Sequence, residues 1–340
     1  MSKCSNAQMA KRLGLRLLIF VIRPLSLYSN FDFRPSNSPF LLFLMLYRTL
    51  GKTNLKVSVV GIGTWQFGGE WGKDFEQSEA TRMLACGKEL GLNLIDTAEC
   101  YGDHLSESLI GGAIAGARAD WIIATKFGHK FHGYMNRTEP RTPADVEKQL
   151  NESLRALRTD YVDLLQYHSW GDEDFPKQDV RDVLSKLIKS GKVRHVGNSI
   201  GSNDNLKQVE DSAGAHVEVI QVIYNRLQRE PEQRVFPSCE RQNLGVLARV
   251  PLASGYLSGK YKPGAAFTGQ DHRANQKPAA RDAKLEEAQR IIREEVPPGV
   301  NPAQWALAWC LKHPAVTCVI PGCKSVEQIE SNAGAANLVV

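Results

Sequence analysis

The sequence is short of long hydrophobic runs. The most apolar stretches near the N-terminus are LLIFVI (17–22) and FLLFLMLY (40–47), whereas a membrane-spanning helix needs about 18 to 20 apolar residues. The first run is bounded by Arg16 and Arg23, and no clear small-residue cleavage site follows it. It is therefore at best a short signal-like region, and we expect no membrane partner.

An excess of one charge sign is missing from most of the chain. The formal net charge is +5, but residues 1–44 carry six basic residues and one acid, which leaves 36 charges of each sign in the rest. The basic balance therefore belongs to this segment and not to a nucleic-acid-binding face, so no nucleic-acid partner is expected.

Residues 1–44 differ in composition from everything that follows them. They are basic, contain serine and are poor in acids, as in an organelle transit peptide. The interpretation we favour is that translation starts at Met45 and that the upstream residues are an artefact of the gene model. We expect no ordered structure before Met45 and a cytoplasmic protein.

Paired cysteines are also absent. The seven cysteines are scattered, odd in number and without a C-x-x-C motif, which is typical of reduced thiols in an intracellular protein. The spacing of Cys318 and Cys323 is better explained by coincidence. His129 and His132 have no clear third ligand near them, so no metal site is expected.

What the sequence does contain is a repeating pattern of short apolar strands and amphipathic helices. Helical stretches include 76–91, 143–158, 180–192 and 302–314. The strands are mostly continuous apolar runs, as in parallel sheets that are covered on both faces. Eight are predicted: 57–63, 92–96, 120–126, 161–168, 193–199, 217–222, 244–250 and 316–320.

Eight strand–helix units over roughly 250 residues predict an α/β fold, a (β/α)8 TIM barrel formed by residues 45–340. A doubly wound sheet is the rival, but Gly61-Ile62-Gly63-Thr64-Trp65-Gln66 lacks the third glycine of the dinucleotide fingerprint. Two segments lie outside the repeat. Residues 46–58 are predicted to form an N-terminal β-hairpin, and the polar segment 258–281 a long loop over the site.

Four functional side chains stand at or just after three successive strand ends. The second strand ends at Asp96 with Tyr101 on the following loop, the third at Lys126 and the fourth at His168. Each alone could be a capping, packing or surface residue. Because strands of this barrel deliver their C-terminal ends to one rim, we expect the four to form an active site there.

The chemistry of these four residues favours carbonyl reduction. A tyrosine hydroxyl has a pKa near 10, and a nearby ammonium lowers it. We therefore expect Lys126, paired with Asp96, to lower the pKa of Tyr101. An imidazole such as His168 can orient a carbonyl oxygen or share the proton.

The chain resembles the aldo-keto reductases from about Met45 to Asn332. The resemblance rests on long ordered motifs: YRTLGKTNLKVSVVGIGTWQFGG (47–69), GLNLIDTAECYGDHLSESLIGGAI (91–114), TPADVEKQLNESLRALRTDYVDLLQYH (142–168), GKVRHVGNS (191–199), RVPLASGYLSGKY (249–261) and IPGCKSVEQIESN (320–332). It implies that Tyr101 is the general acid, that Lys126 and Asp96 tune it, and that His168 orients the substrate.

The resemblance further implies a nicotinamide cofactor, usually NADPH, bound at the barrel rim. Ser199 and Gln221 match residues that hold the carboxamide, and Arg249 stands where relatives often stack an aromatic ring on the nicotinamide. The segment around the pyrophosphate would supply Pro251, Leu252, Ser254, Gly255, Leu257 and Lys260. The segment around the adenosine and its 2′-phosphate would supply Gly322, Lys324, Ser325, Gln328 and Asn332.

Some of these positions carry a second interpretation or depart from the family pattern. Ser325 is also a plain helix N-cap, and Ile200 replaces an asparagine that many relatives use for the carboxamide. Trp65 and Trp170 are candidate substrate-pocket walls, although both could equally pack at the barrel rim.

Two functions follow from the sequence. The first is reversible NADPH-dependent reduction of a small aldehyde or ketone to an alcohol, with Tyr101 as the proton donor. The alternative is an NADPH-binding, redox-sensing regulatory subunit resembling the potassium-channel β-subunits.

Overall fold

The computed structural model describes residues 45–175, 177–203 and 205–339. The predictions for residues 1–44, whether targeting segment or extension, lie outside the described residues.

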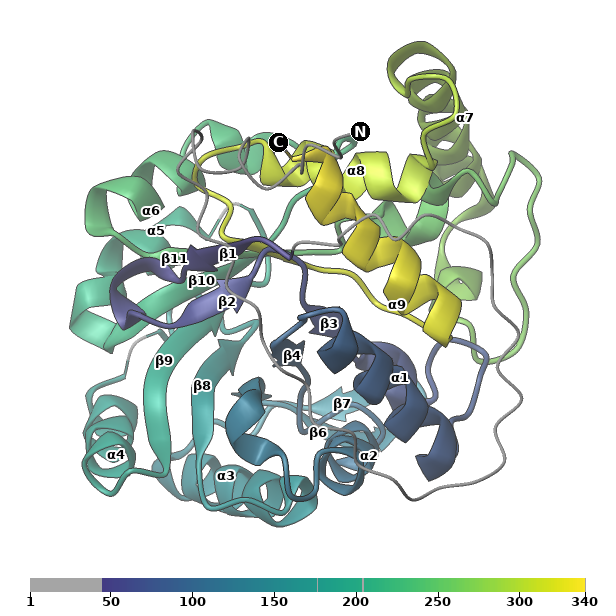
Figure 1. The fold of residues 1–340 in the computed structure, drawn as a ribbon. Helices are drawn as coiled ribbons and strands as arrows, with labels where there is room; N and C mark the ends of the chain where they lie inside the picture. Colours follow the sequence, from purple (N-terminus) through teal and green to yellow (C-terminus); the bar gives the residue numbers. More distant parts are fainter. Residues whose placement is uncertain (1–44, 176, 204, 340) are drawn as a thin grey trace, which may run out of the picture. The chain divides into compact units, whose positions relative to one another are not determined.

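Eight parallel strands form the sheet, and they follow one another around it in chain order. Parallel bridges between Val60 and Val319 and between Gly63 and Gly322 join its two edges, so the sheet closes into a barrel. This confirms the predicted (β/α)8 barrel (Figure 1). The strands are β3 (Ile62–Gly63), β4 (Leu94–Asp96), β5 (Ile122–Phe127), β8 (Val162–His168), β9 (Val193–Ser199), β10 (Val217–Ile223), β11 (Gly245–Arg249) and β12 (Cys318–Ile320).

Helices surround the strands, as Figure 1 shows. The helix at 143–157 illustrates why they form: Thr142 and Asp145 make the reciprocal capping box, proline occupies the first turn, and the apolar stripe from Val146 to Leu157 is buried. The α-helices are α1 (Gln77–Glu89), α2 (Leu105–Ala113), α3 (Pro143–Leu157), α4 (Gln178–Lys189), α5 (Leu206–Glu210), α6 (Val235–Gln242), α7 (Pro278–Glu295), α8 (Pro302–Leu311) and α9 (Val326–Ala333).

The predicted N-terminal hairpin is present and closes one end of the barrel. Strands β1 (Tyr47–Thr49) and β2 (Lys56–Ser58) pair antiparallel. Leu50 and Val57 from this hairpin are fully buried against the apolar side chains inside the barrel, among them Leu94, Leu164 and Leu247. The single strand predicted at 57–63 is divided in the structure: Val57 and Ser58 belong to the hairpin, Val60 bridges to Val319 of the barrel, and Ile62–Gly63 form β3.

The opposite rim carries two further elements. A small hairpin of β6 (Lys130–Gly133) and β7 (Asn136–Thr138) follows β5 and was not predicted. The long loop expected at 258–281 is shorter than expected, because a 3-10 turn spans His272–Asn275 and α7 begins at Pro278. Both elements contribute side chains to the cavity described below.

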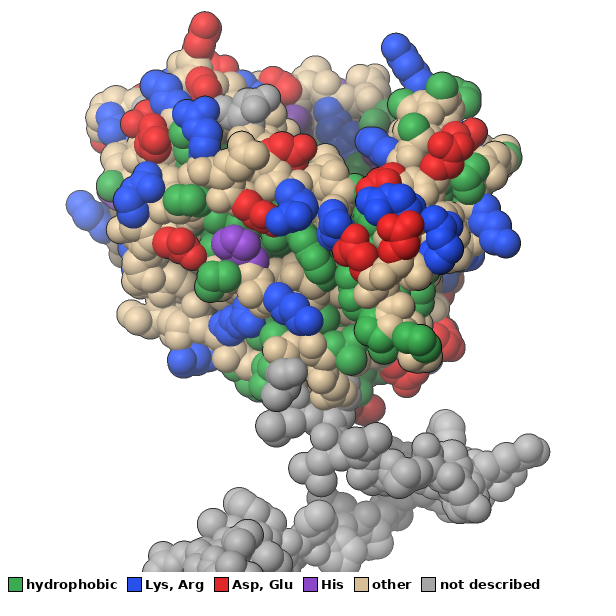
Figure 2. Space-filling view, turned by 90° about the horizontal axis from the view of Figure 1, so that it is seen from above, with side chains coloured by type: hydrophobic (Ala, Val, Ile, Leu, Met, Phe, Trp, Pro, Cys, Tyr) green, Lys and Arg blue, Asp and Glu red, His purple; other side chains and the backbone are tan. Residues whose placement is uncertain are grey.

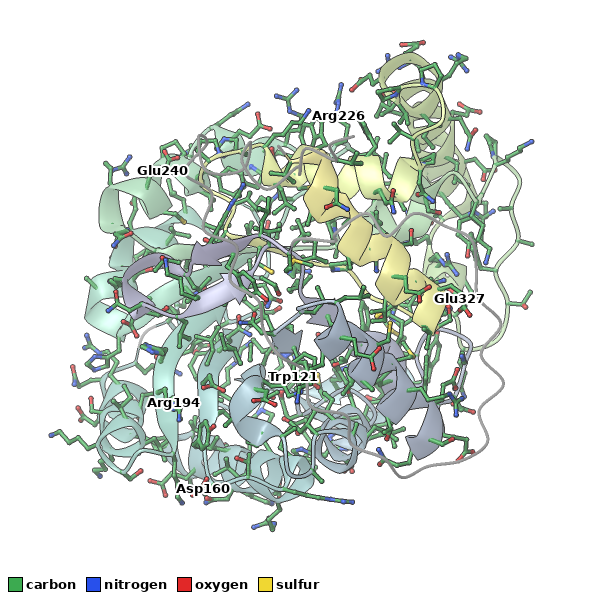
Figure 3. All side chains as sticks on the ribbon, viewed as in Figure 1. Trp121, Asp160, Arg194, Arg226, Glu240 and Glu327 are labelled. Atoms are coloured by element: carbon green, nitrogen blue, oxygen red, sulfur yellow. The ribbon has the colours of Figure 1, made fainter. Side chains whose placement is uncertain are left out.

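One face of the molecule carries charged side chains of both signs. On the face seen in Figure 2, Lys and Arg side chains are interspersed with Asp and Glu side chains, without a broad patch of one sign. In Figure 3 the labelled Asp160 and Glu240 lie at the edge of the ribbon, and both are exposed, whereas Trp121 is buried. Among the described residues, no helix combines the length and apolar character required to cross a membrane.

Candidate active site

A cavity of about 860 Å³ lies at the C-terminal ends of the barrel strands, a size typical of cofactor and ligand sites. Asp96, Tyr101 and His168 line it, and Lys126 is buried beside them with 1 % of its surface exposed. Asp96 is the only carboxylate among the described lining residues, whereas six of them are cationic: Arg137, Arg249, Lys260, Arg273, Lys284 and Lys324.

The four residues expected at the rim do lie together. Lys126 Nζ donates to both carboxylate oxygens of Asp96, at 2.6 and 2.7 Å, and to the Thr97 carbonyl at 2.7 Å. It also contacts Tyr101 Oη at 3.3 Å. The Tyr101 and His168 rings lie edge to face, with their centroids 6.3 Å apart. One phenol, one ammonium and one carboxylate thus form a buried chain that ends at the cavity.

The loop that carries Tyr101 is held tightly against its neighbours. Gly68 packs so closely on the Tyr101 backbone that a Cβ there would stand 2.6 Å from the Tyr101 carbonyl carbon. Ser106 Oγ bonds to the side chains of Thr64 and Thr97, at 2.9 and 3.0 Å. These contacts fix the backbone from which the phenol extends, and a proton donor must be held in position.

The Tyr101 pKa departs from the sequence-based expectation. The nearby Lys126 ammonium lowers it, as predicted, but burial of the phenol outweighs this and raises the pKa to about 12. The expected net lowering is therefore wrong for the protein without ligand. Tyr101 consequently remains a protonated O–H donor throughout the neutral range.

His168 sits in a desolvated and cationic environment. Burial lowers its pKa well below the usual value, and the charges of His129, Lys126, Arg249 and Arg137 act in the same direction. The imidazole is therefore neutral at neutral pH. Its Nδ1 atom lies 3.8 Å from Cys100 Sγ and 3.9 Å from Glu99 Oε1.

Gln221 connects Ser199, a residue expected to bind the cofactor, to the Asp96–Lys126–Tyr101 chain of contacts. Its Nε2 donates to both oxygens of Asp96, at 3.1 and 3.0 Å, and its Oε1 accepts from Ser199 Oγ at 3.2 Å. Asp96 is therefore oriented from two sides, by Lys126 and by Gln221.

Most of the residues expected to hold a cofactor line the cavity: Ser199, Gln221, Arg249, Pro251, Leu252, Ser254, Gly255, Lys260, Gly322, Lys324, Gln328 and Asn332. Leu257 does not, because it is buried in an apolar cluster with Leu285 and Ile291. Ser325 is also outside the lining, and its hydroxyl instead accepts from the Gln328 backbone as the N-cap of α9.

The cavity fits a long anionic molecule such as a nicotinamide dinucleotide. The polypeptide backbone bends sharply along one wall of the cavity, where Val250, Ala253 and Ser254 all adopt positive φ, at 55°, 49° and 59°. Such strained backbone is typical of a ligand clamp. The buried Arg249 Nε has no hydrogen-bond partner among the described residues, and cationic side chains gather along the same cavity.

The outer part of the cavity is walled by aromatic side chains. Trp65 stacks on Tyr101 at an interplanar angle of 22° and meets Trp71 and His272. The prediction that Trp170 lines the substrate pocket is wrong. Trp170 is 1 % exposed, packs on Phe127 and Tyr167 within the core and does not line the cavity.

The sequence interpretation missed several cavity residues because they lie on rim segments instead of strand ends. Trp71 follows the first barrel strand, His129, Met135 and Arg137 come from the β6–β7 region, and His272 from the 3-10 turn before α7. Glu70, 1 % exposed, connects these segments. Its carboxylate accepts from Trp65 Nε1 at 2.7 Å, from the Met135 backbone at 3.1 Å and from Arg137, and its carbonyl accepts from the His272 backbone.

The structure is a closed eight-stranded barrel with a ligand-sized cavity and a buried Asp–Lys–Tyr chain at its rim. Comparison with known proteins identifies the family. The model of the Aldo/keto reductase family matches residues 59–340. The chain belongs to the aldo/keto reductase family and is an oxidoreductase of that family.

Individual relatives agree with this assignment. The chain is similar to the aldo-keto reductase YhdN of Bacillus subtilis (strain 168), at 29 % identity over 84 % of this chain and 87 % of that protein. It is also similar to an Arabidopsis thaliana protein named probable voltage-gated potassium channel subunit beta, at 30 % identity over 87 % and 92 %. Among solved structures it resembles the holo form of the aldo-keto reductase AKR11C1 from Bacillus halodurans, with a TM-score of 0.72 and 30 % identity over 86 % and 91 %.

Proposed function

We propose that this protein reduces an aldehyde or ketone to an alcohol with NADPH, and that the reaction is reversible. The observation that carries the proposal is the buried chain from Asp96 through Lys126 to the Tyr101 hydroxyl, which ends at a cavity lined by cations. Such a chain supplies a proton at one fixed point, as carbonyl reduction requires.

In the proposed reaction, the hydride for the carbonyl carbon would come from NADPH when it is bound. Tyr101 Oη donates its proton to the carbonyl oxygen as negative charge develops there. The Lys126 ammonium, 3.3 Å from Oη, stabilises the phenolate that remains, and Asp96 keeps the ammonium in place. His168, neutral and lining the cavity, orients the carbonyl oxygen.

Arg249, Ser199 and Gln221 would hold the nicotinamide end, and the turn from Pro251 to Gly255 the pyrophosphate. We assign the 2′-phosphate to Lys324. Its pKa is lowered by burial and by the cations around it, with Asp271 acting in the opposite direction. A cationic group in such surroundings gains from an anionic ligand.

The test is a screen of small aldehydes and ketones that follows NADPH oxidation, with Tyr101→Phe as the matched variant. Removal of the hydroxyl should lower turnover by at least about 10²-fold while NADPH binding stays close to that of the wild type. Near-wild-type reduction by Tyr101→Phe would refute the assignment of the proton donor.

A second candidate function rests on the similarity to the protein named as a potassium-channel β-subunit. In that case the barrel would bind NADPH and report its redox state to a partner, with little turnover. The same screen separates the two. Tight NADPH binding with rates no faster than background across the panel would favour the regulatory role.

A further inference from the structure

Glu99, two residues before the proposed proton donor, is a buried carboxyl group that the proposed mechanism does not use. It is 3 % exposed, and its Oε1 accepts a hydrogen bond from the His129 backbone at 2.9 Å. Its Oε2 is buried and has no hydrogen-bond partner among the described residues. Burying a charged carboxyl oxygen without a hydrogen-bond partner costs free energy of folding, so the neutral form of this group is favoured.

The carboxyl group faces one particular nitrogen of the imidazole proposed to orient the substrate. His168 Nδ1 lies 3.9 Å from Glu99 Oε1 and 3.8 Å from Cys100 Sγ. The other nitrogen, Nε2, has no hydrogen-bond partner among the described side chains, while the ring lines the cavity. A neutral imidazole carries one hydrogen, and the group beside one nitrogen decides which of the two bears it.

We propose that Glu99 is a positioning residue that controls which nitrogen of His168 carries the hydrogen. When Glu99 is neutral, His168 Nδ1 is an acceptor that faces the Cys100 thiol. Nε2 then carries the hydrogen and points it toward the substrate oxygen. When Glu99 ionises, its negative charge, 3.9 Å away, attracts the hydrogen to Nδ1. Nε2 then presents a lone pair to the carbonyl oxygen and repels it. The inference rests on the proposed carbonyl reduction, which uses Nε2–H as a donor.

The protonation states around the pair agree with this arrangement. Burial raises the pKa of Glu99 to about 8, opposed by the His129 backbone hydrogen bond, so that the carboxyl is mostly neutral at pH 7. Burial also raises the pKa of the Cys100 thiol, which therefore stays an S–H donor. The charged and titratable groups around Glu99, Cys100 and His168 are Asp96 on β4, Tyr101 on the same loop, His104 just before α2, Glu107 on α2, Lys126 on β5, His129 after β5, Arg137 on β7 and Arg249 on β11.

The decisive experiment reads the tautomer directly, by ¹⁵N NMR of the full chain with labelled histidine and without cofactor. The His168 signals are assigned by their loss in His168→Asn. In the wild type we expect hydrogen on Nε2 at pH 6.5 and a shift of population to Nδ1 near pH 8 to 9. In Glu99→Gln, whose side chain cannot ionise, Nε2–H should persist to pH 9.5. Glu99→Met, equally neutral, should behave in the same way and serves if the amide variant does not fold.

Kinetics supply the second measurement. Wild-type kcat/KM for reduction should fall on the alkaline side with an apparent pKa near 8. This fall should be absent in Glu99→Gln. At pH 6.5 the kcat/KM of Glu99→Gln should be within about threefold of the wild-type value. A tautomer that does not change between pH 6.5 and 9.5 in the wild type, or that still changes in Glu99→Gln, would overturn the proposal. Because the NMR measurement needs no substrate, its failure is distinct from a failure to find reductase activity.

Discussion

Lys126 Nζ donates to both carboxylate oxygens of Asp96 inside the barrel, at 2.6 and 2.7 Å, and neither side chain is more than 4 % exposed. The pair holds the ammonium 3.3 Å from the Tyr101 hydroxyl, and burial strengthens the attraction between the two charges. Removing one partner of a buried pair leaves the other charge uncompensated, which is costly.

Asp96→Asn should therefore reduce both stability and turnover. We expect a loss of about 3 kcal/mol in the free energy of unfolding, measured by urea denaturation, because the Lys126 ammonium loses its counter-charge. Reductase turnover should fall by at least about tenfold because the phenolate loses a fixed ammonium.

Asp163→Asn is the matched control for that variant. Asp163 is 1 % exposed and accepts from Arg118 and Arg194, both at 2.7 Å; it lies at the N-terminal end of β8 and does not line the cavity. It should lose stability while turnover of the remaining folded protein is unchanged. A comparable loss of turnover in both variants would show that Asp96 acts through stability alone.

Lys324→Ala tests the choice of cofactor. If the ammonium binds the 2′-phosphate, the dissociation constant for NADPH should rise by about tenfold or more, whereas that for NADH should change little. Fluorescence titration with each nucleotide measures both constants. Lys312→Ala, an exposed lysine outside the cavity, is the control. Equal weakening of both nucleotides would argue against this role of Lys324.

Glu70→Gln tests whether the rim segments form the substrate pocket. The buried carboxylate joins Trp65, the Met135 backbone and Arg137, so the amide should loosen all three. We expect KM for the carbonyl substrate to rise severalfold with a smaller change in kcat, and stability to fall by about 2 kcal/mol. Glu79→Gln, which removes a partly exposed pair with Lys73, should change stability by less than about 1 kcal/mol and leave KM unaltered.

The Glu99 carboxyl also predicts how stability depends on pH. Its pKa is raised in the folded state, so between about pH 4.5 and 8 the folded protein holds a proton that the unfolded chain releases. Stability should therefore fall as pH rises through this window, by up to about 1.4 kcal/mol per pH unit from this group. Chemical denaturation at several pH values should show a shallower fall for Glu99→Gln. Identical slopes for the two proteins would mean that Glu99 is ionised when folded.

The barrel, and the place of Asp96, Tyr101, Lys126 and His168 at its rim, could be predicted from the sequence alone. Strand and helix periods are local properties, and parallel strands in a closed barrel bring their C-terminal ends to one place whatever their distance along the chain. The N-terminal hairpin could be predicted for the same reason, since its turn and strands lie within a dozen residues.

Which side chains are buried and which reach the cavity depends on the three-dimensional packing and could not be predicted from the sequence. In the sequence Trp170 could line the pocket or pack in the core, and Ser325 could bind a phosphate or cap a helix; the structure buries Trp170 in the core and uses Ser325 as the cap of α9. The burial that raises the pKa of Tyr101 and of Glu99 comes from segments far apart in the chain. Desolvation sums over all neighbours in space, so no local pattern reveals whether it outweighs the charge of a single lysine.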